Sequence, residues 1–160
     1  EMTSSLVGSE SCIRDSYNET LRDRICAVSN KTHYNEMNVL SMHALIGAYQ
    51  PQGYEWVDEL NQVLAGNIEY FCNYVDEHFE GVSYSRPQGT YMVFLDCTEW
   101  CREHGRDIQW LLDEGARVGV GYQDGRPFHG PCHIRVNLAL PLSRVREACD
   151  RLDRYVFNAR

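Results

Sequence analysis

The spacing of apolar residues predicts two successive helices in the first half of the chain. Apolar side chains recur every three or four positions from Asn35 to Tyr49, and the pattern ends in QPQG, residues 50–53. The same spacing then follows one face from Tyr54 to Phe79, which corresponds to a helix about 39 Å long. A helix of this length is typical of a connection between two bodies of a protein. Residues 1–33 show no sustained period and predict no clear element.

Alternation of apolar and polar residues predicts strands in the second half. Residues 82–96, VSYSRPQGTYMVFLD, contain two extended runs around a turn with proline and glycine, a pattern typical of a β-hairpin. Further on, apolar residues alternate with polar ones from Ile134 to Leu140. This alternation predicts a half-buried strand that carries Arg135 and Asn137 on its other face.

Short helices complete the predicted α/β arrangement. Asp107 can cap a helix that ends at Gly115, a residue type favoured just after helices, and residues 116–122 then resemble a short strand. The loop YQDGRPFHGP, residues 122–131, has two glycines and two prolines, which favours a surface loop of the kind that carries sites. An apolar stripe beginning near Ser143 predicts a terminal helix.

Length and charge restrict the class of protein. A chain of 160 residues with 43% hydrophobic residues suffices for one domain with a core. The net charge of −8 argues against nucleic acid or an anionic membrane as the main partner. No apolar run approaches a membrane span, and seven scattered cysteines without a dense scaffold pattern favour reduced thiols. The sequence therefore predicts a cytoplasmic protein that binds small molecules or protein.

Arg135 is the first candidate for chemistry. Its guanidinium stays charged and presents a planar fork of donors that fits a carboxylate bidentately. A strand that follows a structured loop can hold such a fork rigidly. The alternative is an arginine that is merely solvated at the edge of a sheet.

A zinc site is a second candidate. Cys97, Cys101 and His104 are spaced to line one helical face, and Cys132 with His129 or His133 could complete four ligands. The spacing is looser than in paired CxxC sites, and cysteines also serve as small core residues.

Lys31 is the only lysine in the chain, so Schiff-base chemistry would have to use it or an amine from elsewhere. It lies in the polar segment SNKTHYN. A solvated lysine before a helix is the simpler interpretation.

Three segments, in order and at ordinary spacing, resemble one known family. They are residues 34–71 with the motif EWVDEL…N, residues 87–96 with P-x-G-T-Y, and residues 133–141 with R-x-N-x-A-x-P. They resemble the C-terminal part of the class I/II (fold type I) pyridoxal-phosphate-dependent aminotransferases, nearest the cystathionine β-lyase-like (C–S lyase) branch. The resemblance runs from about Asn18 to Val156.

The resemblance implies a fold and a role. It implies an α/β small domain at residues 81–160, with a small mixed or antiparallel sheet covered by helices, a long connecting helix at 54–80, and a remnant of the large cofactor domain at 1–53. In the family, the arginine at the position of Arg135 binds the substrate α-carboxylate, and Asn137 matches a supporting position. Gly125 and Phe128 also match the family pattern.

The departures from the family bear on catalysis. The family's cofactor lysine lies in an SK-x-F/W-N motif upstream of these segments, and a GL-x-G stretch usually comes after that motif. SLVGS, residues 5–9, resembles this stretch, ESCIRDS, residues 10–16, does not fit, and NKTHYN, residues 30–35, imitates the lysine motif at the wrong place. The resemblance therefore implies pyridoxal phosphate in a complete enzyme and none bound by this chain alone. The expected partners are an amino-acid carboxylate and either a second copy or the missing large domain. The alternatives are a non-catalytic interaction or dimerisation module and a zinc-stabilised domain.

Overall fold

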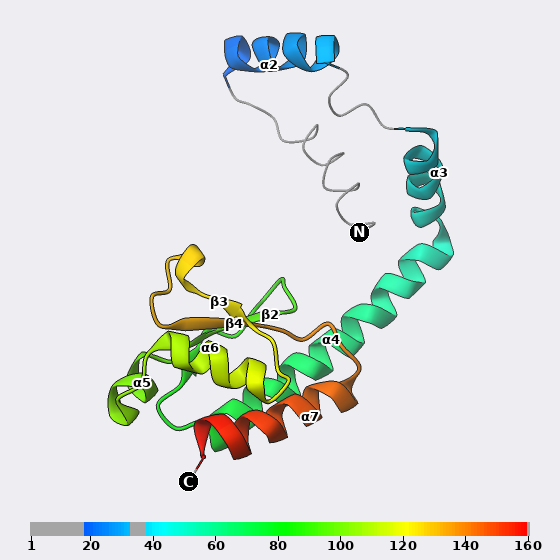
Figure 1. Ribbon diagram of the computed structural model, residues 1–160. Coiled ribbons are helices and arrows are strands. Elements are labelled where there is room, and N and C mark those ends of the chain that lie inside the picture. Colours follow the sequence, from blue (N-terminus) through cyan, green and yellow to red (C-terminus); the bar gives the residue numbers. More distant parts are fainter. Residues whose placement is uncertain (1–17, 33–37, 160) are drawn as a thin grey trace. The chain divides into compact units, whose positions relative to one another are not determined.

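The computed structural model describes residues 18–32 and 38–159 and divides into two compact units, Glu1–Asp58 and Glu59–Arg160 (Figure 1). Its α-helices are α2 (Glu19–Thr32), α3 (Val39–Ala48), α4 (Pro51–His78), α5 (Thr98–His104), α6 (Ile108–Arg117) and α7 (Leu142–Leu152). Its strands are β1 (Ser83–Tyr84), β2 (Met92–Asp96), β3 (Gln123–Asp124) and β4 (His133–Asn137). A 3₁₀ turn spans Arg126–Phe128, and a π-helical turn spans Asp153–Phe157. In the part of the chain so described, no helix has the length and apolarity of a membrane span.

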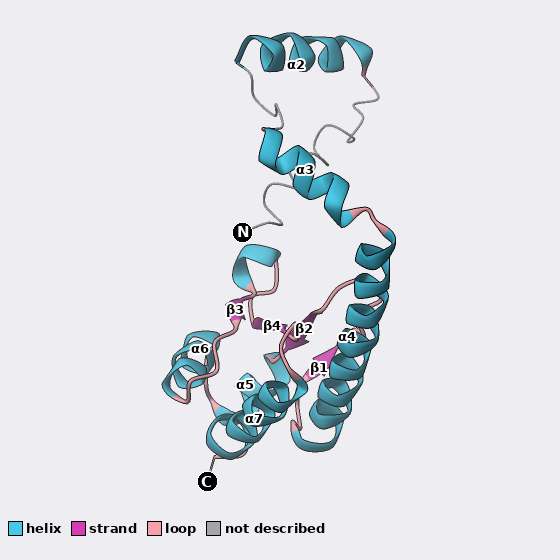
Figure 2. Ribbon diagram, turned by 90° about the vertical axis from the view of Figure 1, so that its right-hand side faces the viewer, coloured by secondary structure: helices cyan, strands magenta, loops and turns pink. Residues whose placement is uncertain are grey.

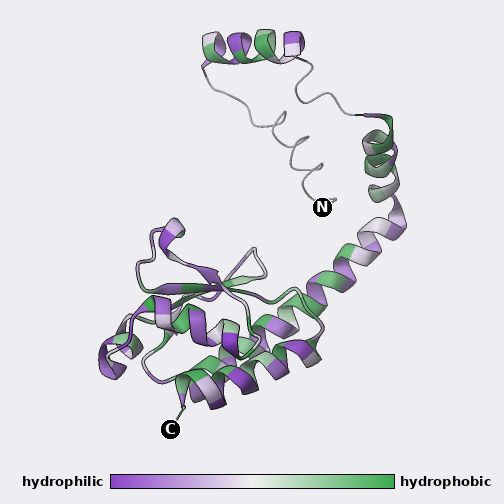
Figure 3. Cartoon of the chain, in the orientation of Figure 1, coloured by the Kyte–Doolittle hydropathy of each residue, from purple (hydrophilic) through white to green (hydrophobic). Residues whose placement is uncertain are grey.

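The first unit consists of α2, α3 and the start of α4. The Asn38 side chain caps α3 by accepting a hydrogen bond from the Ser41 N–H at 2.9 Å. The helix α3 is strongly apolar (Figure 3), yet Val39 and Leu40 are 66% and 83% exposed. Its apolar surface is therefore unusual for a solvent-facing helix.

The long helix α4 begins at Pro51, three residues before the predicted start at Tyr54. Proline suits the first turn of a helix because its missing N–H has no partner there and its φ is already helical. The helix runs for 28 residues, about 42 Å. Its apolar face becomes buried only from Asn67 onward, in the second unit.

The second unit contains one antiparallel sheet in the order β1-β2-β4-β3. Pairing of β1 with β2 confirms the predicted hairpin, and β4 is the predicted arginine strand. Figure 2 shows the strands beside α4, α6 and α7. The helices and one face of the sheet share a core in which each fully buried aliphatic side chain contributes about 1.5–3 kcal/mol; its members include Phe71, Val75, Val93, Leu95, Leu111, Ile134, Val145 and Leu152.

Two predictions next to α6 are wrong. Asp107 does cap this helix, since its side chain accepts from the Trp110 N–H at 2.8 Å, but the helix continues past Gly115 to Arg117. Glycine is required at position 115 because the Tyr122 side chain packs against it: a Cβ there would lie 2.4 Å from the Tyr122 hydroxyl oxygen. Residues 116–122 form the end of this helix, a turn and a connecting segment, and the strand appears only at β3.

Candidate carboxylate-binding site

The candidate site lies on the face of the sheet opposite the core. Side chains alternate along β2 and β4, so Val93, Leu95, Ile134 and Val136 are buried while their neighbours in sequence are partly exposed. Arg135 is paired in register with Phe94 of β2 and with Gln123 of β3. Residues directly opposite in an antiparallel pair share a face, so the sheet brings these three side chains into one row.

The sheet holds the backbone of Arg135, while the N–H donors of its side chain remain available to a ligand. Its side chain is half-buried, and the guanidinium carbon lies 4.7 Å from the centre of the Phe128 ring. Over residues 18–32 and 38–159, no hydrogen bond or ion pair engages this guanidinium. The contact with the ring involves no acceptor oxygen, so the five guanidinium N–H donors remain available to a carboxylate, which they can bind bidentately.

An aspartate and a histidine flank Arg135 on the same face. The Asp96 Oδ2 lies 3.8 Å from the His133 Nε2, and the His133 ring lies 4.7 Å from that of Phe94. Burial opposes ionisation of Asp96, but hydrogen bonds from the Thr98 hydroxyl and backbone N–H, together with His133, hold the pKa of its carboxyl below the ordinary value. Asp96 is therefore anionic at neutral pH and places a negative charge beside His133 on this face.

Asn137 shapes the end of β4. Its side chain is exposed, and its Oδ1 accepts a hydrogen bond from the Ala139 N–H at 2.8 Å. This bond turns the chain after the strand and leaves the amide Nδ2 free to donate among the described residues. Asn137 is thus two residues from Arg135 on the same face of the strand, as the alternation predicts.

Asn67 of α4 holds the chain that follows β4, a role that the sequence analysis did not predict. It is the only polar residue in the buried core of the described chain, at 1% exposed. Its Nδ2 donates to the carbonyl oxygens of Leu138 at 2.9 Å and Leu140 at 2.7 Å. A polar residue on the otherwise apolar face of α4 was the available signal, since a buried amide requires partners.

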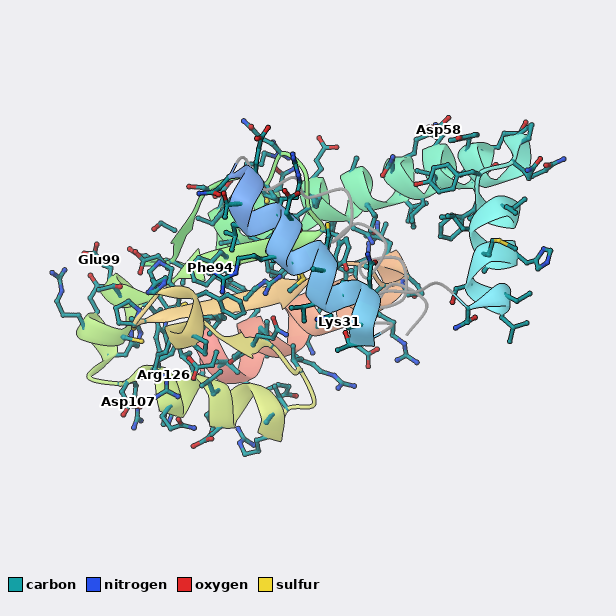
Figure 4. All side chains as sticks on the ribbon, turned by 90° about the horizontal axis from the view of Figure 1, so that it is seen from above. Lys31, Asp58, Phe94, Glu99, Asp107 and Arg126 are labelled. Carbon is teal, nitrogen blue, oxygen red and sulfur yellow. The ribbon has the colours of Figure 1, made fainter. Side chains whose placement is uncertain are left out.

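The loop before β4 carries Phe128 and packs tightly against the strand. Gly125 is buried, and a Cβ there would lie 2.4 Å from the His133 carbonyl oxygen. Figure 4 labels Arg126 in this loop and Phe94 on β2. The two family-matching positions, Gly125 and Phe128, therefore both contact the strand that bears Arg135.

The remaining candidates are Lys31 and the zinc ligands. Lys31 is an exposed residue at the end of α2 (Figure 4), and residues 33–35 of NKTHYN, like segments 5–9 and 10–16, lie outside the described residues. Cys97 and Cys101 are buried in the core, where burial raises the pKa of the Cys101 thiol to about 12. Within the described ranges no three His, Cys, Asp or Glu side chains are placed to hold a metal, so the zinc alternative finds no site there.

Comparisons with known proteins agree with this architecture. No protein-family model matches the chain. A curated protein of Mycobacterium leprae, named "Putative cystathionine beta-lyase", is 34% identical over 124 residues, which is 68% of this chain and 30% of the relative. A protein of the same name from Mycobacterium tuberculosis is 32% identical over 128 residues, with the same shares of the two chains covered.

Solved structures share the fold. A pyridoxal-phosphate-bound aminotransferase-like protein from Clostridium difficile superposes with a TM-score of 0.74 at 23% identity, covering 86% of this chain and 35% of that one. The pyridoxal-phosphate-bound C–S lyase of Staphylococcus hominis gives 0.73 at 22% identity, with 89% and 36% covered. The chain therefore has the fold of the fold type I pyridoxal-phosphate-dependent aminotransferases. Its curated relatives carry the cystathionine β-lyase name, and it spans about 30% of their length.

Proposed function

We propose that Arg135 binds the α-carboxylate of an amino-acid substrate in a pyridoxal-phosphate-dependent C–S β-lyase or aminotransferase. The observation that carries this proposal is a half-buried arginine whose guanidinium donors have no protein partner among the described residues. It stands on a paired strand, and a fork held in this way orients a carboxylate as well as attracting it. Asn137 is the second substrate-binding residue, through its exposed amide.

In this proposal the chain is the C-terminal part of the enzyme. Residues 81–160 form the small domain, residues 54–80 the connecting helix, and residues 1–53 belong to the domain that binds the cofactor. The match to only about 30% of each curated relative supports this division, because most of such a protein lies outside the chain.

The described residues do not by themselves fit a pyridoxal-phosphate site. Such a site needs an amine for the cofactor aldehyde and groups for its ring nitrogen and phosphate. The only lysine of the chain, Lys31, is an exposed residue of the other compact unit, and the row around Arg135 contains none. The chemistry at the substrate Cα therefore belongs to the rest of the enzyme, and this chain supplies recognition and orientation.

A second candidate function is a non-catalytic interaction or dimerisation module. The exposed apolar side chains of α3 favour it, because an apolar surface of this kind gains free energy when another chain covers it. Sedimentation of the purified chain tests the module: self-association that Leu40→Glu abolishes supports it, and a strictly monomeric chain counts against it.

Titration by nuclear magnetic resonance tests the carboxylate site directly. The Arg135 Nε–Hε signal of the ¹⁵N-labelled chain is followed while L-alanine is added, and L-alaninamide, which lacks the carboxylate, is the control ligand. We expect a saturable shift with L-alanine alone. In Arg135→Lys the backbone signals of β4 should no longer respond, since a lysine offers no bidentate fork. An equal response to both ligands would contradict the proposal.

A further inference from the structure

The Phe128 ring makes a cation–π contact with the guanidinium of Arg135. The ring centre lies 4.7 Å from the guanidinium carbon, although Phe128 itself is 47% exposed. An exposed aromatic ring is normally free to change rotamer, and an arginine side chain has more rotatable bonds still. Contact between the guanidinium and the ring restricts both side chains.

The loop that bears Phe128 is itself braced. Its backbone closes on Gly125, whose carbonyl oxygen accepts from the N–H groups of Phe128 at 2.8 Å and Gly130 at 3.0 Å. The Gly125 N–H in turn donates to the His133 carbonyl of β4 at 2.9 Å. The ring is therefore presented by a short closed loop tied to the same strand that carries Arg135.

A polar network ties this loop to α6 as well. Arg126 donates through Nε to the Asp124 Oδ2 at 2.7 Å and through a terminal nitrogen to the Gln109 Oε1 at 3.0 Å. His129, just after Phe128, has a φ of 63°, a left-handed conformation that is uncommon for residues other than glycine. Such a conformation persists where the surroundings hold it, and here it ends the 3₁₀ turn directly behind the ring.

We propose that Phe128 is a positioning residue that holds the plane of the Arg135 guanidinium so that its in-plane donors meet a carboxylate bidentately. The inference rests on the proposed function of Arg135 and adds the element that orients it. Without the ring, the charge of Arg135 remains but the guanidinium adopts several orientations. Carboxylate binding must then order the Arg135 side chain, and this loss of entropy lowers the affinity. A structural role alone would affect folding; a positioning role affects the affinity for the carboxylate and the mobility of the guanidinium.

The test uses the 160-residue chain and the L-alanine titration. Phe128→Leu keeps an apolar side chain without a ring face, Phe128→Tyr restores the ring, and Tyr155→Leu is the matched control at another exposed aromatic residue. We expect Phe128→Leu to weaken L-alanine binding roughly two- to five-fold, the range of an exposed cation–π contact. The heteronuclear NOE of the Arg135 Nε should fall in Phe128→Leu, while Phe128→Tyr and Tyr155→Leu match the wild type in both measurements.

The outcomes distinguish this inference from the proposed function. If Arg135→Lys abolishes the L-alanine response but Phe128→Leu leaves affinity and NOE unchanged, the positioning role is overturned and the carboxylate site stands. If L-alanine gives no specific response in the wild type, the proposed function itself fails. A melting temperature of Phe128→Leu equal to that of the wild type, together with weaker binding restored by Phe128→Tyr, supports the inference.

Discussion

Asn67→Asp is the substitution that most sharply tests how α4 supports the candidate site. It replaces the amide by a carboxyl group of nearly the same shape, so packing is preserved. The native Nδ2 donates to two backbone carbonyl oxygens, those of Leu138 and Leu140, at a position that is 1% exposed. An ionised carboxylate there has no hydrogen to donate and faces both oxygens at close range.

The expected loss comes from these contacts. Two hydrogen bonds contribute about 1 kcal/mol each, and the two carbonyls lose their donor. An unpaired buried charge adds a penalty of its own, so the total should be about 3–5 kcal/mol at pH 7. Asn61→Asp makes the same charge change at an exposed position of the same helix and should alter stability by less than about 0.5 kcal/mol.

Urea unfolding at a series of pH values measures the effect. Burial raises the pKa of the introduced carboxyl above its unfolded value, so the penalty should shrink as pH falls toward 4, where the protonated group can donate one hydrogen bond. Asn61→Asp should show no such recovery. A loss below about 1 kcal/mol at pH 7, or a loss that does not depend on pH, would refute the role given to Asn67.

Three further predictions concern packing, pH dependence and thiol reactivity. Thermal unfolding should show that Gly125→Ala lowers the free energy of unfolding by about 1–3 kcal/mol, because its Cβ would lie 2.4 Å from a backbone oxygen of β4. The control Gly89→Ala should be near neutral, because a Cβ there has no atom within contact distance. Stability should fall as pH drops below about 4, because the pKa of Asp96 is lower in the folded than in the unfolded protein. The stabilisation by Asp96 is lost as pH falls through its pKa in the folded protein. A melting temperature that stays level down to about pH 2.5 would contradict this. With Ellman's reagent, the exposed Cys26 should react at once and the buried Cys149, whose pKa burial raises to about 12, only on unfolding; fast reaction of Cys149 in the native chain would refute its burial.

Much of the fold is predictable from periodicity. The long helix α4, the hairpin, β4 and α7 each carry a pattern strong enough to predict them, because each buries one face in a common core. The helix α2 has no such pattern, since none of its residues is buried. Gly115 misled the prediction because glycine after a helix and glycine under an aromatic ring look alike in sequence, and only the tertiary contact with Tyr122 tells them apart.

The site was predictable in part. Alternation along β4 predicts that Arg135 and Asn137 share a face, but it does not predict the register that places Phe94 and Gln123 beside the arginine. Stacking of Phe128 on Arg135 depends on the closed loop before β4, which the composition of the loop suggests only as a turn. These contacts join segments far apart in sequence or within an irregular loop, where periodicity carries no information.

The kinetics of a chimeric enzyme test the central claim, that this chain supplies the carboxylate-binding arginine of a pyridoxal-phosphate enzyme. In the assembled protein, this chain replaces the matching part of the Mycobacterium leprae relative. Pyruvate release from L-cystathionine is measured with pyridoxal phosphate present. We predict turnover by the assembled protein and none by the 160-residue chain alone. Arg135→Ala should lower kcat/KM roughly 100-fold or more, since two charge-assisted hydrogen bonds are lost, while Arg117→Ala, at an exposed arginine of α6, should match the parent. An unchanged kcat/KM in Arg135→Ala, or pyruvate release by the chain alone, would contradict the account.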